Sequence, residues 1–127
     1  MNNLLKLLAF VCIALMANAS TAQAIRPATV TIDGLIILDN SIPDLASDYV
    51  ADITNLNITS WQGANTFFQK YLDKTNGRGI NISFDLPNRK IYISIDVANQ
   101  YVVPLSHEPL NVSTFNEFFR AVHEGRI

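Results

Sequence analysis

The two histidines are the first residues to consider for chemistry, because imidazole is a common general base and metal ligand in proteins. Each is followed by a glutamate, in His107-Glu108 and His123-Glu124. These four side chains would bind zinc if the segment around residue 107 folded back onto the end of the chain. Neighbours on a helix point about 100° apart, so neither pair is by itself a chelate. A simpler role for His123 is to face the partial negative charge of a helix C-terminus.

Two groups of aspartates have spacings that chemistry could use. Asp85 and Asp96 lie on the polar side of two predicted strands, where a pair facing each other would resemble the carboxylates of a glycosidase. Opposed like charges destabilise a sheet, and the two residues lie at different distances from the turn between the strands, so we interpret both as solvated. Asp44, Asp48 and Asp52 recur every four residues. On a helix they would form a solvated face or, alternatively, a site for a cation or a basic partner.

No other catalytic motif is apparent in the sequence. Ser106 lies beside His107 but lacks a nucleophile elbow. Gly77-Arg78-Gly79 is too short for a phosphate-binding loop and is explained by a helix stop and a turn. The sequence therefore predicts a protein that is not an enzyme and that needs no metal or cofactor.

Residues 1–24 have the three parts of a secretory signal peptide. Lys6 supplies the charge, an apolar run follows over 7–17, and Ala22-Gln23-Ala24 is a small-residue cleavage site. The run is shorter than the roughly 20 residues of a membrane span. We therefore expect cleavage and a periplasmic product without a transmembrane segment, with an uncleaved anchor helix as the alternative. Cys12 would leave with the signal peptide, so no disulfide would stabilise the product.

The composition of residues 25–127 predicts one folded domain. Hydrophobic residues make up 49% of the chain and charged residues 16%, which excludes general disorder. Loss of Lys6 would leave 8 basic against 11 acidic residues, so a nucleic-acid partner is not expected. Sequons begin at Asn57, Asn81 and Asn111, and we interpret them as coincidental.

The first half of this domain predicts a strand, a short helix and another strand. Residues 30–38 are mostly apolar, with a bulge or kink expected at Gly34. A helix should open at Ser41 and Pro43 and present one apolar face. The members of that face would be Leu45, Tyr49, Val50 and Ile53. Residues 55–59 alternate as in a short strand.

The second half predicts a helix, a hairpin and a final helix. A capping box of Thr59 with Gln62 should open an aromatic-striped helix over 61–75. Alternating residues over 80–86 and 91–97, with a turn at 87–90, predict an antiparallel hairpin. An extended piece over 101–105 and a helix opened by Thr114 with Glu117 complete the chain. The expected fold class is α+β: a small mixed or antiparallel sheet with aromatic-faced helices packed on one side.

The order of these elements carries a resemblance to a known family. Asn57-Ile58-Thr59 leads into 61–75, two strands follow, and 109–114 leads into a last apolar helix. The segment 56–122 resembles the short N-terminal domain shared by secretins and TonB-dependent receptors, and more loosely the periplasmic ring domains of secretins. The resemblance implies protein–protein contacts inside envelope machines such as secretion systems and pili. The chain departs from the family in having no outer-membrane barrel, secretin core or TonB-contacting motif.

The sequence therefore predicts an exported interaction module, an accessory subunit of a secretion or pilus apparatus. Contact with its protein partner would use edge-strand pairing through 55–59 or 101–105. The alternative is a periplasmic inhibitor or immunity protein that enters an enzyme cleft with a loop at 104–111. The candidate partner-contact residues are Asn57, Thr59, Arg78, Arg89, Lys90, Tyr101, His107 and Glu108. Arg78, Arg89 and Lys90 are expected to form a basic rim at one end of the hairpin.

Overall fold

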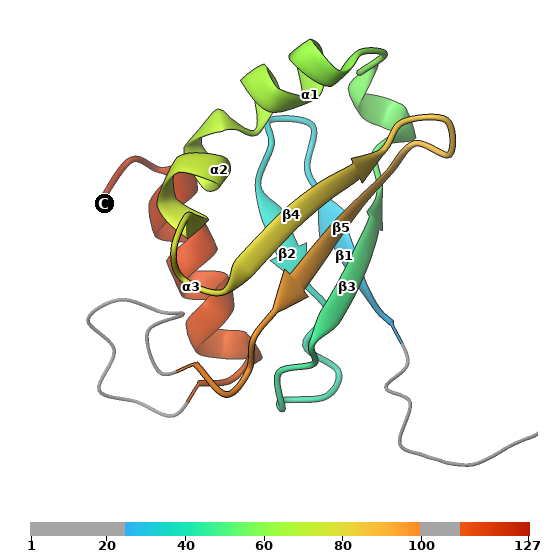
Figure 1. The fold of residues 1–127 in the computed structure, drawn as a ribbon. Helices are drawn as coiled ribbons and strands as arrows, with labels where there is room; N and C mark the ends of the chain where they lie inside the picture. The colour runs from blue at the N-terminus through green and yellow to red at the C-terminus, as the bar shows by residue number, and fades with distance from the viewer. Residues whose placement is uncertain (1–24, 100–109) are drawn as a thin grey trace, which may run out of the picture.

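The protein is a five-stranded mixed sheet with its helices on one side, which confirms the expected α+β class (Figure 1). The computed structural model describes residues 25–99 and 110–127. The strands are β1 (Arg26–Val30), β2 (Ile36–Leu38), β3 (Asp48–Asp52), β4 (Ile80–Asp85) and β5 (Lys90–Ile95). The helices are α1 (Trp61–Phe67), α2 (Gln69–Thr75), α3 (Val112–His123) and the 3-10 turn η1 (Thr54–Leu56).

The strand order in the sheet is β2-β1-β3-β5-β4. Only β1 and β3 run parallel, and their pairing covers just two positions, Arg26 with Tyr49 and Pro27 with Val50. The other three neighbouring pairs are antiparallel. Beyond Pro27 the two parallel strands lose their register, and an opening of about 520 Å³ lies between 28–30 and 52–55.

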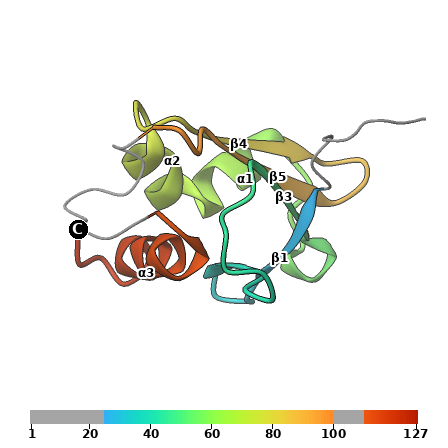
Figure 2. The same cartoon turned by 90° about the horizontal axis from the view of Figure 1, so that it is seen from below.

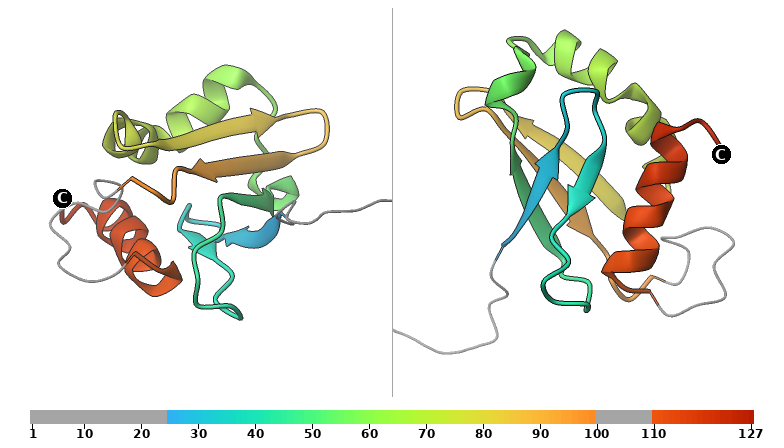
Figure 3. Two further views of the ribbon diagram at one scale, coloured as in Figure 1. Left: turned by 60° about the horizontal axis from the view of Figure 1, so that its bottom comes forward. Right: turned by 180° about the vertical axis from the view of Figure 1, so that it is seen from behind.

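The sheet is curved, and α2 and α3 close the gap between its two edge strands. α3 packs against β2, α2 packs against α3, and α2 also touches β4. The view from below shows α2 and α3 on the same side of the strands (Figure 2), and the view from behind shows α3 alongside β2 (Figure 3). Because the helices bridge the sheet in this way, each edge strand has a helix beside it.

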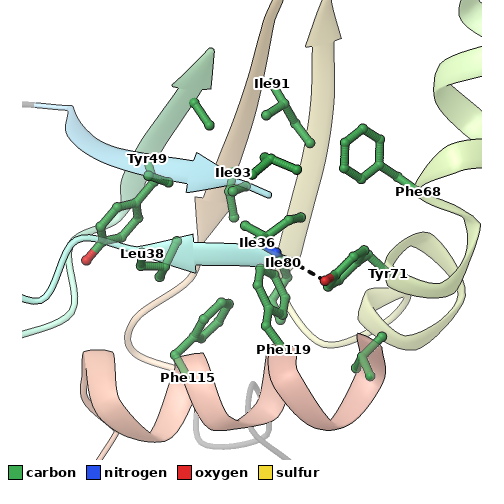
Figure 4. Packing of buried hydrophobic residues seen from close by; sticks show 14 of the residues in the cluster. Ile36, Leu38, Tyr49, Phe68, Tyr71, Ile80, Ile91, Ile93, Phe115 and Phe119 are labelled. Carbon is green, nitrogen blue, oxygen red and sulfur yellow. Dashed lines mark hydrogen bonds between the residues drawn. The ribbon is translucent and has the colours of Figure 1, made fainter. Parts of the chain in front are cut away.

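Alternation along the strands places one set of apolar side chains in the core. Ile91, Ile93 and Ile95 of β5 are buried, whereas Tyr92 and Ser94 between them lie on the opposite, uncovered face. Figure 4 shows the rings of the helices closing over these strands. The rings that close the core are Phe68, Tyr71, Phe115 and Phe119, each at most 2% exposed. Truncating one such ring to alanine typically costs about 3–5 kcal/mol.

The final helix has the predicted buried face but a different start. Phe115, Phe118, Phe119 and Val122 are buried, as expected. The helix begins at Val112 instead of Thr114, because the Asn111 side chain accepts a hydrogen bond from the backbone N–H of Thr114, whose hydroxyl accepts from the backbone N–H of Asn111. Glu117 does not cap the helix; its carboxylate pairs with Arg126 at 2.8 Å.

The predicted short helix after Pro43 is wrong, because its core is the central strand β3. Tyr49 and Ala51 point into the core and alternate with Asp48 and Asp52 on the other face, which is a period of two. The aspartates explain why this segment forms a strand and not a helix. Asp48 lies opposite Ser94, whose hydroxyl donates to its carboxylate at 2.7 Å, and Asp52 pairs with Lys90. On a helix these carboxylates would repel one another.

The predicted single strand over 30–38 is a hairpin. β1 and β2 are joined by a turn in which the Gly34 N–H donates to the carbonyl of Thr31 at 2.9 Å. Gly34 has φ of +97°, a conformation that side-chain-bearing residues rarely adopt. The glycine therefore reverses the chain, where the sequence had indicated only a kink.

The predicted strand over 55–59 is also wrong. Residues 54–56 form η1, and Asn57 has φ of +58°, which a strand does not contain. The helix predicted over 61–75 is two helices that meet at Phe68, and its cap is Ser60, whose hydroxyl accepts from the N–H of Gly63, instead of Thr59. The hairpin of β4 and β5 is confirmed, with six paired positions and a turn at 86–89.

Candidate interaction site

The two edges of the sheet are built differently, and β2 forms one of them. The N–H of Thr31 donates to Leu35, and that of Asp39 donates to Pro27, so these residues face across the hairpin. Because backbone direction alternates along an antiparallel pair, Ile36 and Leu38 must turn their N–H and C=O groups outward. An outward row of this kind is a template for pairing with another strand.

Side chains from the helices hydrogen-bond to most of this outward row of β2 and to the neighbouring Gly34 carbonyl. The Tyr71 hydroxyl accepts from the N–H of Ile36 at 3.2 Å and donates to the carbonyl of Gly34 at 3.0 Å. The Asn116 amide accepts from the N–H of Leu38 at 2.8 Å and donates to its carbonyl at 3.0 Å. Figure 4 shows the tyrosine reaching the strand. The β2 edge is therefore closed to a further strand.

The Tyr71 ring lies in the core while its hydroxyl serves the edge. Burial raises the pKa of Tyr71 to about 12, since the phenolate would lose its hydration, and the hydrogen bond from the N–H of Ile36 offsets only part of this effect. The hydroxyl thus stays protonated and can donate to Gly34 across the physiological range.

The opposite edge, β4, is not closed in this way. The N–H of Asp96 donates to the carbonyl of Gly79, so Asn81 and Ser83 bond to β5. The backbone groups of Ile80, Ile82 and Phe84 then point away from the sheet. Within residues 25–99 and 110–127, no side chain or backbone group is hydrogen-bonded to this outward row. β4 also contains neither the proline nor the lysine that commonly protects an edge.

A groove accompanies the first half of β4. It has a volume of about 260 Å³ and lies between the end of α2 and Ile80–Ile82. Leu72 and Ile82 contribute half-buried apolar surface, and Asp73 and Asn76 are exposed at its rim. The other half of the edge is flanked by Trp61, which is 59% exposed and packs edge-on to Phe84 at a centroid distance of 6.3 Å.

Of the residues singled out in the sequence, Asn57 and Thr59 are exposed but lie after η1 instead of on an edge strand. The expected basic rim is wrong, because Arg78 precedes β4, whereas Arg89 lies in the turn after its other end and Lys90 pairs with its last residue, Asp85. Six strand residues at about 3.4 Å each separate them by roughly 20 Å. Lys90 pairs with the carboxylate of Asp52 at 3.3 Å.

Three other candidates, Tyr101, His107 and Glu108, lie outside the described residues, as do the extended piece at 101–105 and most of the loop at 104–111. The roles proposed for these three residues and for the two segments therefore remain predictions from the sequence. The signal peptide predicted over 1–24 also lies outside the described part of the chain.

The carboxylate and histidine chemistry considered above finds little support. Asp85 lies opposite Lys90, and Asp96 bonds to Gly79 at the far end of the hairpin. An offset of six strand residues, roughly 20 Å, exceeds the carboxylate separation of either glycosidase geometry. His123 ends α3 and contacts the carboxylate of Asp33 at 3.3 Å. Among the described side chains, no three of the types His, Cys, Asp and Glu gather as a metal site would require.

Hydrogen bonds lower the pKa of three surface carboxyls, Asp33, Asp39 and Asp52. The Thr31 hydroxyl and, second to it, the His123 ring lower the pKa of Asp33. The hydroxyl and the N–H of Thr54 lower the pKa of Asp52 to about 2, with a smaller effect from Lys90. Asp33 and Asp52 are exposed, and the largest effect on each comes from a threonine two residues away, so we assign both to local structure and not to a site.

Comparisons of this chain with family models, with curated proteins and with solved structures find no match. In addition, none of the described helices has the length and apolar character needed to cross a membrane.

The β4 edge was missed at the sequence level although its strand was predicted correctly. Periodicity shows which residues form a strand but not which strand lies at the border of the sheet. The available signal was the absence of proline and lysine from 80–85. A composition of this kind is typical of an interior strand or of an edge that pairs.

Proposed function

We propose that this chain is an exported protein–protein interaction module of the cell envelope, an accessory subunit of a secretion or pilus apparatus, which binds its partner through strand addition at β4. The observation that carries the proposal is the unequal treatment of the two edges. Tyr71 and Asn116 hydrogen-bond to the outward groups of β2, whereas those of β4 have no hydrogen-bond partner among residues 25–99 and 110–127. A sheet edge with free N–H and C=O groups binds an extended chain through main-chain hydrogen bonds.

We propose β4 in place of 55–59 for this contact, because 55–59 is not a strand and, among the described residues, β4 is the strand at an open border of the sheet. The resemblance to secretin N-terminal domains and the signal-like leader supply the compartment and the class of machine. Nothing in the described residues favours the alternative of an inhibitor, whose loop lies mostly outside them.

The test is photo-crosslinking in a bacterium that produces the full chain. A photoreactive residue at Ser83, exposed on β4, should crosslink to a component of a secretin or pilus apparatus. The matched control is Thr29, which is exposed on an interior strand of the same sheet. Ile82→Pro, which removes one outward N–H and leaves the bonds to β5, should abolish the Ser83 adduct.

Equal adducts from both positions, or none from Ser83, would contradict the assignment of the edge. Adducts with a secreted enzyme instead of an envelope component would support the inhibitor hypothesis.

A further inference from the structure

The groove beside β4 has a chemical character of its own, and its lining bears on the partner. Ile80 and Ile82 turn their side chains to the helix side, where Leu72 of α2 faces them. Their backbone N–H and C=O groups point outward, two residues or about 6.8 Å apart. An extended chain repeats its hydrogen-bonding groups at this same interval, so the geometry calls for a segment in β conformation.

We infer that this groove binds an extended peptide segment that carries an apolar side chain and, two residues away, a lysine or arginine. The inference rests on the proposed function and specifies the partner segment. Alternate residues of a strand added at β4 would face the helix side. The first of them would meet Leu72 and Ile82, both half-buried and therefore able to bury further apolar surface.

Asp73 supplies the preference for a cation. It lies at the rim of the groove, and one of its carboxylate oxygens accepts a hydrogen bond from the Gln69 amide at 2.8 Å. No lysine, arginine or histidine of the described chain forms an ion pair with it. A basic side chain on the incoming strand would therefore find an available partner. Because the site is exposed, the expected discrimination is about two- to fivefold in affinity.

A second copy of this chain fits the edge less well than a peptide does. Two copies joined through β4 about a two-fold axis normal to the sheet would carry their helix layers on the same face. In Figure 1, α1 and α2 run beside the whole of β4, so the helices of the two copies would compete for the same space. A single extended segment needs only the groove.

The test uses the full chain and three fluorescein-labelled nine-residue peptides of alternating threonine and valine. They differ at one central valine, which is replaced by lysine, by glutamate or by threonine. Fluorescence anisotropy at low salt should rank lysine first and glutamate last. Asp73→Asn should remove the difference between lysine and glutamate. Asp44→Asn, a charge removal at an exposed loop residue, should leave the ranking unchanged.

The outcomes separate this inference from the proposed function. Equal binding of all three peptides that Ile82→Pro abolishes would overturn the inference and leave strand addition intact. Absence of peptide binding would overturn the inference, and the Ser83 crosslinks would then decide the proposed function separately. If the full chain dimerises in sedimentation experiments and Ile82→Pro removes the dimer, the edge binds a second copy, and the inference of a peptide partner is overturned. Circular dichroism verifies that each variant is folded, and Asp73→Asn tests the charge preference even if Ile82→Pro does not fold.

Discussion

The hydroxyl of Tyr71 offers a direct test of how the β2 edge is closed. Tyr71→Phe keeps the ring in the core but leaves the N–H of Ile36 and the carbonyl of Gly34 without their common partner. A buried polar group that loses its hydrogen bond costs about 1–3 kcal/mol. Both hydrogen bonds are buried, and a cost of about 1–1.5 kcal/mol for each of the two groups gives an expected loss of about 2–3 kcal/mol in the free energy of unfolding. For a domain of this size that lowers Tm by roughly 8–20 °C.

Urea denaturation and thermal unfolding of both proteins measure this loss. The matched control is Tyr92→Phe on the uncovered face of β5, where no hydrogen bond involves the hydroxyl among the described residues. It should change the free energy of unfolding by less than about 0.5 kcal/mol. A Tyr71→Phe variant as stable as the control would refute the idea that the hydroxyl closes the edge.

The ionisation of Tyr71 adds a check at high pH. Its folded-state pKa is raised to about 12 from a usual value of 10, so the folded state holds its proton more tightly than the unfolded state does. The corresponding stability is fully present below pH 10 and is lost as the pH rises toward 12. The decline over this window should be shallower in Tyr71→Phe.

Three further predictions follow from individual contacts. Asn116→Ala, which removes both bonds to the β2 backbone, should lower the free energy of unfolding by about 2–4 kcal/mol in urea denaturation. Gly79→Ala should lower the free energy of unfolding more than Gly77→Ala does. Both glycines have positive φ, but only at Gly79 would the new Cβ lie within 3.1 Å of other side chains. Equal losses in the two variants would argue against a clash. The pKa of Asp52 is lowered to about 2, chiefly by hydrogen bonds from Thr54. Its contribution to stability is therefore present above pH 4 and lost as the pH falls toward 2. In Asp52→Asn, the free energy of unfolding should fall less steeply over that pH window.

The parts of the fold with an unambiguous period were predictable from the sequence. The apolar residues of β4 and β5 alternate over six residues each, and the phenylalanines of α3 repeat every one to three residues along one face, so the hairpin and the buried face of the last helix were predicted correctly. β3 was misassigned because Tyr49 and Val50 are adjacent, and such a pair fits a helical stripe as well as a strand. Only its neighbours in the sheet decide between them.

The candidate site was less accessible to sequence reasoning, because it depends on contacts between distant segments. Asn116 and Leu38 are 78 positions apart, and nothing local in either segment indicates that an amide will close a strand edge. Likewise, the distance between Arg78 and Arg89 follows from the length of β4, which separates two residues that a hairpin had been expected to bring together.

The short parallel seam between β1 and β3 has a consequence for how the molecule opens. Only two paired positions join the β1–β2 hairpin to the antiparallel strands β3, β5 and β4. The hairpin is otherwise held by its core side chains, by the hydrogen bonds from Tyr71 and Asn116, and by the contact of Asp33 with His123. Since local opening follows the boundaries where few main-chain bonds must break, we expect this hairpin to separate as one cooperative unit. Its amides would then exchange with deuterium well before those of β5.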